Sequence, residues 1–148
     1  MAEGRGQKPE RRVKRERAGE RKRRKRRKEM TRAIYWFDEP EDHNYPAGAE
    51  YLSLLVDPAI AKALVQRLRD APIAHFKAKD IFRASGLPLA GICNSQVEKT
   101  LHKIECEKKL SPLLLVRHMN SLVIADGYHR MCAVYSHDQD AKIPCKII

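Results

Sequence analysis

Apolar positions divide this chain of 148 residues into two parts. Residues 1–32 contain, besides two methionines, only Ala2, Val13 and Ala18 as apolar residues. Such a stretch buries too little surface to offset the conformational entropy lost on ordering. After it, apolar residues recur with helical and strand periods. We therefore expect a tail that is disordered or forms a frayed solitary helix, followed by one globular part.

Two helices are predicted from capping sequences. Asp57 and Pro58 have the residue types of an N-cap and first helical position, and Ser95-Gln96-Val97-Glu98 matches a capping box. The residues expected to face the core are Ile60, Ala63, Leu64 and Leu68 in the first helix, and Val97, Leu101 and Ile104 in the second.

Short apolar runs between polar turns predict the remaining elements. They are a strand over 73–76, a short helical turn over 80–86, a hairpin of 113–117 and 122–125, a helix after Gly127 with Met131, Val134 and Tyr135 inward, and a strand over 143–148. This order is typical of a small α/β or α+β domain with a mixed sheet and flanking helices. We divide the chain into a tail (1–32), a helical lead-in packed on the domain (33–72) and the domain itself (73–148).

The net charge of the chain is confined to the tail and bears only on its predicted function. Residues 1–32 hold 16 Lys and Arg against 5 Glu, a net +11, whereas residues 33–148 hold 14 of each sign. The tail is therefore predicted to contact nucleic-acid phosphates without sequence preference, because it lacks aromatic residues for base stacking. A solubilising extension is the alternative. The contacts would centre on Arg23, Arg24, Lys25, Arg26 and Arg27.

The strongest chemical signal is the sequence Asp126-Gly127-Tyr128-His129-Arg130, between a predicted strand and a predicted helix. A helix N-terminus offers unpaired N–H groups and about half a positive charge, so phosphate binds there readily. Gly127, His129 and Arg130 are the candidate phosphate ligands. Asp126 would repel phosphate unless it caps the helix or faces a bound Mg²⁺.

Residues 111–148 resemble the C-terminal half of the ParB N-terminal domain and sulfiredoxin superfamily. The turn from Gly127 to Arg130 is similar to the Gly-Cys-His-Arg turn of sulfiredoxin and the Gly-Glu-Arg-Arg turn of ParB. Ser111 to Arg117 look like the strand that follows the helix in ParB-like domains, and Ala133, Ile143 and Pro144 match a small helix residue and the entry to the last strand.

The resemblance implies a nucleotide-binding domain whose ligand is a nucleoside triphosphate, ATP or CTP, with Mg²⁺ held at Asp126. As an enzyme, such a protein would hydrolyse a nucleotide or transfer a phosphoryl group, with Asp126 or His129 orienting the attacking water or hydroxyl. An early strand beside the turn would let Lys79 and Arg83 supply a second basic arm. Tyr128 stands where sulfiredoxin has its reactive cysteine, so sulfinic acid reduction is not expected.

Two other classes of function stay open: a non-sequence-specific nucleic-acid-binding protein acting through the tail, and a noncatalytic interaction domain. No long apolar segment and no secretory-type apolar stretch occur, so we expect a cytoplasmic protein without membrane insertion. The four cysteines lack metal-site spacing and are expected to be reduced and mostly buried.

Overall fold

The computed structural model describes Val13, residues 16–21, residues 32–91 and residues 94–148. Two compact units are distinguished, Met1–Arg32 and Ala33–Ile148. In the first, Val13 and residues 16–21 are helical and exposed. The predicted phosphate-contacting residues of the tail, Arg23, Arg24, Lys25, Arg26 and Arg27, lie outside the described residues.

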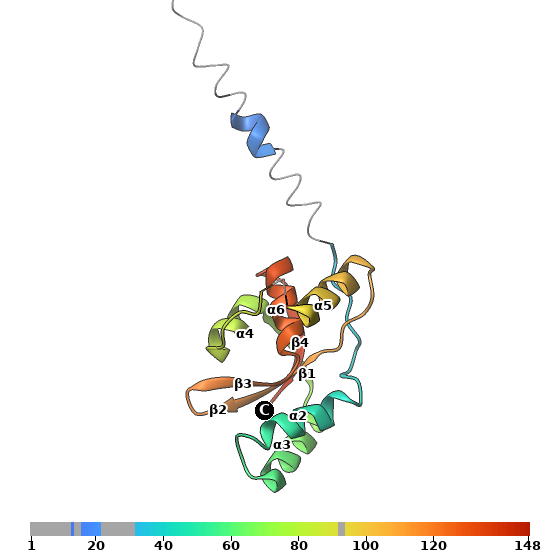
Figure 1. The fold of residues 1–148 in the computed structure, drawn as a ribbon, viewed down its shortest axis with the longest axis vertical. Helices are drawn as coiled ribbons and strands as arrows, with labels where there is room; N and C mark the ends of the chain where they lie inside the picture. The colour runs from blue at the N-terminus through green and yellow to red at the C-terminus, as the bar shows by residue number, and fades with distance from the viewer. Residues whose placement is uncertain (1–12, 14–15, 22–31, 92–93) are drawn as a thin grey trace, which may run out of the picture. The chain divides into compact units, whose positions relative to one another are not determined.

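Among the described residues, four strands form one mixed sheet, as the sequence predicts (Figure 1). Its order is β1-β4-β2-β3, in which β1 and β4 are antiparallel, β4 and β2 parallel, and β2 and β3 antiparallel. The strands are β1 (Ile73–Lys77), β2 (Leu113–His118), β3 (Ser121–Asp126) and β4 (Lys142–Ile147).

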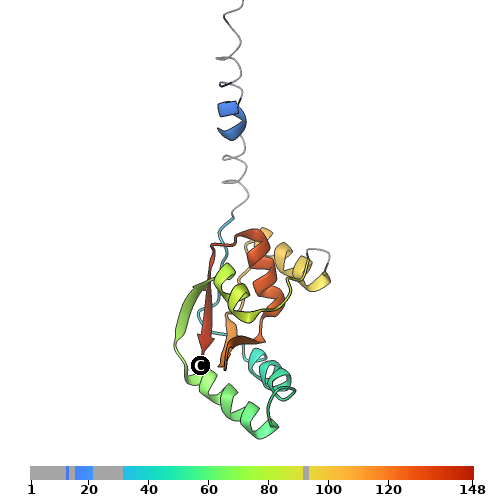
Figure 2. The same cartoon turned by 90° about the vertical axis from the view of Figure 1, so that its left-hand side faces the viewer.

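Helices cover both faces of this sheet (Figures 1 and 2). One face packs against α4, α5 and α6, and the other packs against α2 and α3. The helices are α2 (Asn44–Leu52), α3 (Pro58–Asp70), α4 (Ala78–Ser85), α5 (Ser95–Glu105) and α6 (Tyr128–His137).

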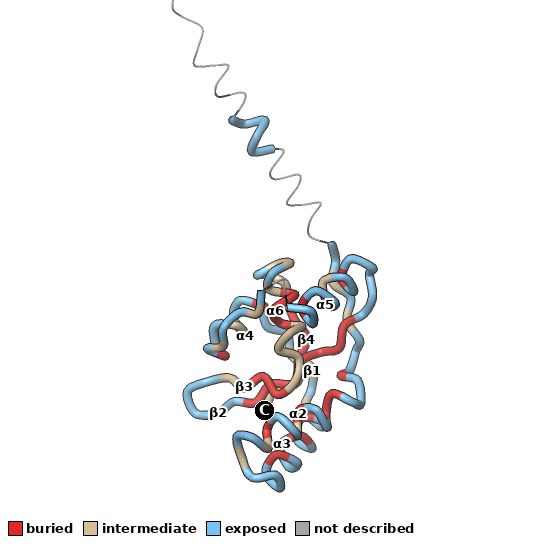
Figure 3. Tube along the Cα trace, viewed as in Figure 1, coloured by how far each residue is buried: buried red, intermediate tan, exposed pale blue. Residues whose placement is uncertain are grey.

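Strand β2 explains why its sequence is apolar without alternation. Leu113 and Leu115 belong to the core beneath α4, α5 and α6, whereas Leu114 and Val116 belong to the core beneath α2 and α3. A strand covered on both faces needs apolar side chains at every position. Figure 3 shows the buried residues gathered along β2, β4 and α6.

Helix α2 occupies a stretch that the sequence analysis did not assign to a helix, because it contains Pro46 and Gly48. Pro46 is the third residue of the helix, where its missing N–H costs no intrahelical hydrogen bond. Gly48 faces the sheet, where an added Cβ would stand 3.5 Å from Leu114 Cδ1. Both residues are therefore compatible with a helix that packs closely on the strands.

Two details of the predicted helices were wrong. In α3 the buried residues are Ala61, Val65 and Leu68, while Ile60 is 53% exposed, so the helix is rotated relative to the predicted stripe. In α5 the N-cap is Asn94, whose side chain accepts hydrogen bonds from two backbone N–H groups, and Ser95 is the first helical residue. Asn is as effective a cap as Ser, so the sequence alone did not separate them.

The described cysteines differ in exposure. Cys132 and Cys145 are buried and Cys106 is exposed, all with free thiols, while Cys93 lies outside the described residues. Within the part of the chain that the structure describes, no helix has the length and apolar character needed to span a bilayer.

Candidate functional site

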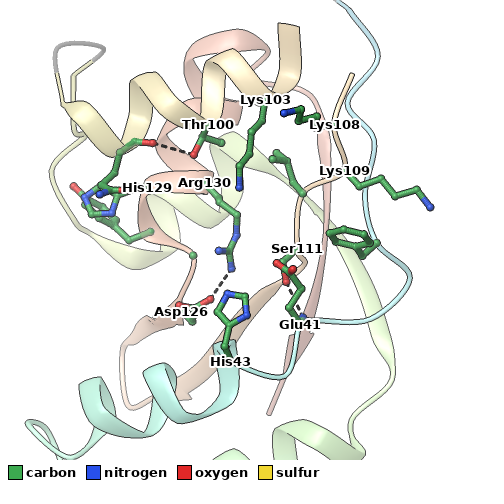
Figure 4. A pocket seen from close by; sticks show the side chains of 15 residues that line it. Glu41, His43, Thr100, Lys103, Lys108, Lys109, Ser111, Asp126, His129 and Arg130 are labelled. Carbon is green, nitrogen blue, oxygen red and sulfur yellow. Dashed lines mark hydrogen bonds and ion pairs between the residues drawn. The ribbon is translucent and has the colours of Figure 1, made fainter. Parts of the chain in front are cut away.

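A cavity of about 580 Å³ lies at the N-terminal end of α6 (Figure 4). Three parts of the fold form it: the first turn of α6, the helix α5 with the segment that follows it, and the segment that leads into α2. The side chains that matter below are Glu41, His43, Lys103, Lys108, Lys109, Ser111, Asp126, His129 and Arg130.

The first turn of α6 presents backbone N–H groups to this cavity. Its N-cap is Gly127, whose φ of 103° lies in the left-handed region and which supplies no capping side chain. The helix begins with the hydrogen bond from the N–H of Met131 to the carbonyl oxygen of Gly127, at 2.9 Å. The preceding N–H groups have no acceptor within an α-helix, so they and the helix dipole favour an anion here.

Glycine is required at position 127 by the lack of space for a side chain as well as by the backbone φ angle. A Cβ at this position would stand 2.8 Å from Leu113 Cγ and 3.0 Å from the Nη2 atom of Arg130. Such separations are shorter than side chains tolerate, so the backbone approaches β2 as closely as it does only because the side chain is absent.

Asp126 does not cap α6, in contrast to one of the two roles expected for it. Its Oδ2 atom accepts a hydrogen bond from Arg130 Nη2 at 2.6 Å, and the side chains are 19% and 20% exposed. Arg130 Nη2 also lies 3.5 Å from the carbonyl oxygen of Pro112. Arg130 therefore compensates the negative charge that would otherwise repel phosphate.

The guanidinium group of Arg130 is not fully satisfied by these contacts. Its Nε atom is buried and has no hydrogen-bond partner among the described residues. A buried donor without an acceptor costs about 1–3 kcal/mol.

Tyr128, the first residue of α6, is anchored through its hydroxyl group. Its hydroxyl group donates a hydrogen bond to the carbonyl oxygen of Pro88, and its ring lies edge-on to His129 with centroids 5.2 Å apart. Burial, followed by the proximity of Cys132, raises the pKa of Tyr128. The phenol is thus protonated at neutral pH and joins the loop before α5 to α6.

Lysines form the wall opposite Asp126. Lys103 belongs to the last turn of α5, and Lys108 and Lys109 follow that helix. In Figure 4, Lys103 points toward the middle of the cavity, whereas Lys109 extends away from it. The Lys109 ammonium lies 5.9 Å from the centroid of the Phe37 ring. The wall therefore supplies at least one inward cation.

A small hydrogen-bond network fixes the third side of the cavity. The Ser111 hydroxyl group donates to Asn44 Oδ1 and accepts a hydrogen bond from the N–H of Glu41 at 3.0 Å. Ser111 and Asn44 are 3% and 2% exposed. This network holds the segment before α2 against the start of β2. As a result, His43 points into the cavity from below (Figure 4).

The segment before that network is held to the domain at two further places. Trp36 forms a parallel β-bridge with Leu110, and the N–H of Phe37 donates to the carbonyl oxygen of Leu110 at 2.8 Å. The Glu39 carboxylate pairs with the buried ammonium of Lys146 at 2.7 Å. Phe37, Glu41 and His43 are therefore structured parts of the site.

The predicted phosphate ligands line one cavity, although the ring of His129 lies apart from Arg130 in Figure 4, and the predicted second basic arm lies elsewhere. Gly127, His129 and Arg130 line the cavity with Asp126. Lys79 pairs with Asp140 at 2.7 Å, and Arg83 pairs with Asp80 at 3.3 Å. Neither of these cations is among the residues that line the cavity.

Sequence reasoning missed the cavity residues contributed by other elements. The sequence indicated Lys108 and Lys109 only as cations suited to a helix C-terminus and Ser111 only as the start of a strand. The acidic loop from Asp38 to His43 was interpreted as solvated rather than as a metal or substrate site, and Lys103 carried no signal. Their approach to the turn depends on how α5 packs on α6 and how the segment before α2 crosses β2. No local pattern encodes either.

The acidic groups available for a cation are few. Asp126 and Glu41 are the carboxylates of the cavity lining. The described residues contain no group of three or more His, Cys, Asp or Glu side chains placed to hold a metal ion. Mg²⁺ commonly binds through one or two carboxylates together with substrate phosphates, and Asp126 is compatible with that mode of binding.

No protein-family model, curated protein or solved structure matches this chain. Membership of the ParB and sulfiredoxin superfamily therefore stays a prediction from residues 111–148.

Proposed function

We propose that the cavity at the N-terminus of α6 binds the phosphate groups of a nucleoside triphosphate, ATP or CTP. One observation carries the proposal: the uncapped first turn of α6, Arg130 and the inward-pointing Lys103 converge on the same cavity. Its volume of about 580 Å³ falls within the usual range for small-ligand sites.

The charges of the lining support an anionic ligand. The cations are Lys103, Lys108, Lys109 and Arg130, and the carboxylates are Glu41 and Asp126. Because Arg130 already compensates Asp126, the lysines remain as the excess charge. In this arrangement the backbone N–H groups of the α6 turn hold one phosphate, and Lys103 neutralises the next.

Asp126 and His129 are the groups that would take part in chemistry. The hydrogen bond to Arg130 uses Oδ2 of Asp126, so the second carboxylate oxygen is the one that would hold Mg²⁺. His129 is the residue we assign to orient an attacking water or hydroxyl, which would make the protein a nucleotide hydrolase or phosphoryl transferase. The metal would supply charge neutralisation at the phosphates.

The proposal is tested by calorimetric titration of the full chain with ATP, CTP and GTP, with and without Mg²⁺. Each charge-assisted hydrogen bond contributes about 1.5–3 kcal/mol, so Lys103→Ala should weaken binding at least about tenfold. Lys79→Ala is the matched control, because it removes the same charge from a lysine outside the cavity. Equal affinities of these two variants would refute the site.

A second function is favoured by one observation, the location of the net charge. Residues 1–32 carry a net +11 while residues 33–148 are neutral. We propose that the tail binds nucleic-acid phosphates without sequence preference. Filter binding of duplex DNA at about 50 and 200 mM salt should show affinity that falls steeply with salt and is lost without residues 1–32. Unchanged affinity after that deletion would exclude the role.

A further inference from the structure

A second cavity lies at the other end of β2. Its volume is about 520 Å³, and it shares no lining residue with the cavity at α6. The sheet forms its floor, α4 forms one side, and the turn of the β2–β3 hairpin forms the rim. The lining residues are Phe76, Asp80, Ile81, Ala84, Leu115, Arg117, Met119, Asn120, Ser121, Leu122 and Ile147.

Most of this groove is apolar. Phe76, Leu115 and Ile147 contribute side chains from three neighbouring strands, and Ile81 contributes one from α4. Phe76 is 38% exposed, although it is a large aromatic residue. Covering such surface is favourable by about 25 cal/mol for each Å² removed from water. Binding of an apolar ligand in the groove is therefore favoured by the burial of this apolar surface.

The rim of the groove carries an exposed methionine. Met119, in the two-residue hairpin turn, is 94% exposed and adopts a φ of 44°, in the left-handed region that side chains other than glycine rarely occupy. An exposed, flexible thioether beside an apolar groove adapts readily to a bound hydrocarbon.

Arg117 is the cation of this groove. It lies two residues after Leu115 on β2 and so projects from the same face of the sheet. None of the ion pairs found among residues 32–91 and 94–148 includes Arg117. The carboxylate of the lining, Asp80, pairs with Arg83 at 3.3 Å. The groove thus combines apolar walls with one uncompensated guanidinium.

We propose that this groove binds a small amphiphilic carboxylate, in which a hydrocarbon chain lies on the apolar floor and the carboxylate accepts paired hydrogen bonds from Arg117. The guanidinium fork matches the two oxygens of a carboxylate. A phosphate dianion suits the groove less well, because the lining contains no second cation. Sites of this size with mostly apolar walls and a few polar groups are typical of small-molecule binding.

The test is titration of the full ¹⁵N-labelled chain with octanoate below its micelle concentration, followed by amide chemical shifts. Saturable shifts should appear at Phe76, Leu115, Leu122 and Ile147, which identifies the groove and separates it from the basic tail. Octanol, which has the same chain without the carboxylate, should bind at least tenfold more weakly.

Three variants make the test decisive. Arg117→Gln should weaken octanoate binding at least tenfold and bring it to the level of octanol, and Ala84→Trp should abolish it by filling the groove. Both positions are exposed, so the fold is expected to tolerate the changes. Arg67→Gln makes the same change as Arg117→Gln at an exposed position of α3 that lines neither cavity, so it should leave octanoate binding unchanged. The proposal is overturned by shifts confined to the tail or the α6 cavity, or by equal affinity in Arg117→Gln and Arg67→Gln.

Discussion

Arg130 and Asp126 form an ion pair across the first turn of α6, with 2.6 Å between Nη2 and Oδ2. The two residues stand four apart, on either side of Gly127 and the helix start. Because about a fifth of each side chain is exposed, the pair is screened less than a surface pair. The pair thus fixes the cation of the proposed phosphate site before any ligand binds.

Replacing Asp126 should therefore affect stability more than replacing a similar surface acid. We expect Asp126→Asn to lower the free energy of unfolding by about 2 kcal/mol, since hydrogen bonds to charged groups contribute about 1.5–3 kcal/mol. Asp80→Asn is the control, because it breaks an exposed pair with Arg83 and should cost less than about 1 kcal/mol. Urea denaturation measures the free energy of unfolding of both variants. Equal losses would show that the Asp126–Arg130 pair contributes no more than an exposed ion pair.

Three glycines should separate backbone strain from lack of space. Gly91→Ala should be nearly neutral, because nothing lies within 4 Å of its added Cβ. Gly86→Ala should cost about 1 kcal/mol, because its φ is +63° although the space is open. Gly127→Ala should cost about 3 kcal/mol or more, because it combines a φ of +103° with a contact of 2.8 Å to Leu113. Thermal unfolding that ranks the three differently would contradict this account.

The sequence predicts the parts of this fold that are specified by nearby residues. The β2–β3 hairpin, α6 and β4 follow from apolar runs and turns within a few positions of one another. The start of α3 at Pro58 follows from the cap at Asp57, whose side chain accepts the N–H of Ala59 at 2.8 Å. The prediction was wrong where tertiary packing overrides the local sequence pattern. The buried face of α3 is rotated from the predicted one, and the helix α2 forms despite Gly48, which packs against Leu114.

The same distinction applies to the candidate site. Gly127, His129 and Arg130 were identifiable because they are contiguous and stand between a strand and a helix. Lys103 is more than twenty residues away, and its approach depends on the packing of α5 against α6. For Asp126 the sequence predicted either a helix cap or a ligand of Mg²⁺. The ion pair with Arg130 was not predicted, because it depends on side-chain geometry.

The loop after α6 should make stability depend on pH in acid. Hydrogen bonds from Lys79 and then Lys77 lower the pKa of Asp140 below its ordinary 3.8. Because the folded-state pKa is the lower one, this contribution is present above pH 3.8 and is lost as pH falls through the folded-state value. The Tm of Asp140→Asn should lie below that of the unmodified protein at pH 6, and the two should converge below pH 3.8.

Lys79 provides the coupling test for that prediction. Lys79→Ala should lower Tm at pH 6 in the same direction, and the double variant should lose less than the sum of the single losses. Additive losses, or a gap in Tm that persists at pH 2, would mean that Asp140 acts independently of its lysines.

Thiol reactivity should distinguish the buried and exposed cysteines. Burial raises the pKa of the Cys145 thiol from 9.0 to about 12, whereas Cys106 is exposed at the end of α5. The thiolate is the reactive form, so Cys145 should be unreactive toward an aromatic disulfide reagent at pH 8 in the folded protein. In a Cys93→Ser background, one thiol should react rapidly and the others only after denaturation. The additional change Cys106→Ser should remove the rapid phase, and Cys145→Ser should not.

The same thiol should weaken the fold at high pH. The unfolded state, with a thiol pKa of 9.0, releases its proton before the folded state does. Stability from this group is therefore complete below pH 9 and declines as pH rises toward 12. Urea midpoints measured at pH 8 and pH 10.5 should fall less in Cys145→Ala than in the unmodified protein, even though the variant starts lower because it leaves a small cavity. Identical declines in both proteins would show that Cys145 ionises freely in the folded state.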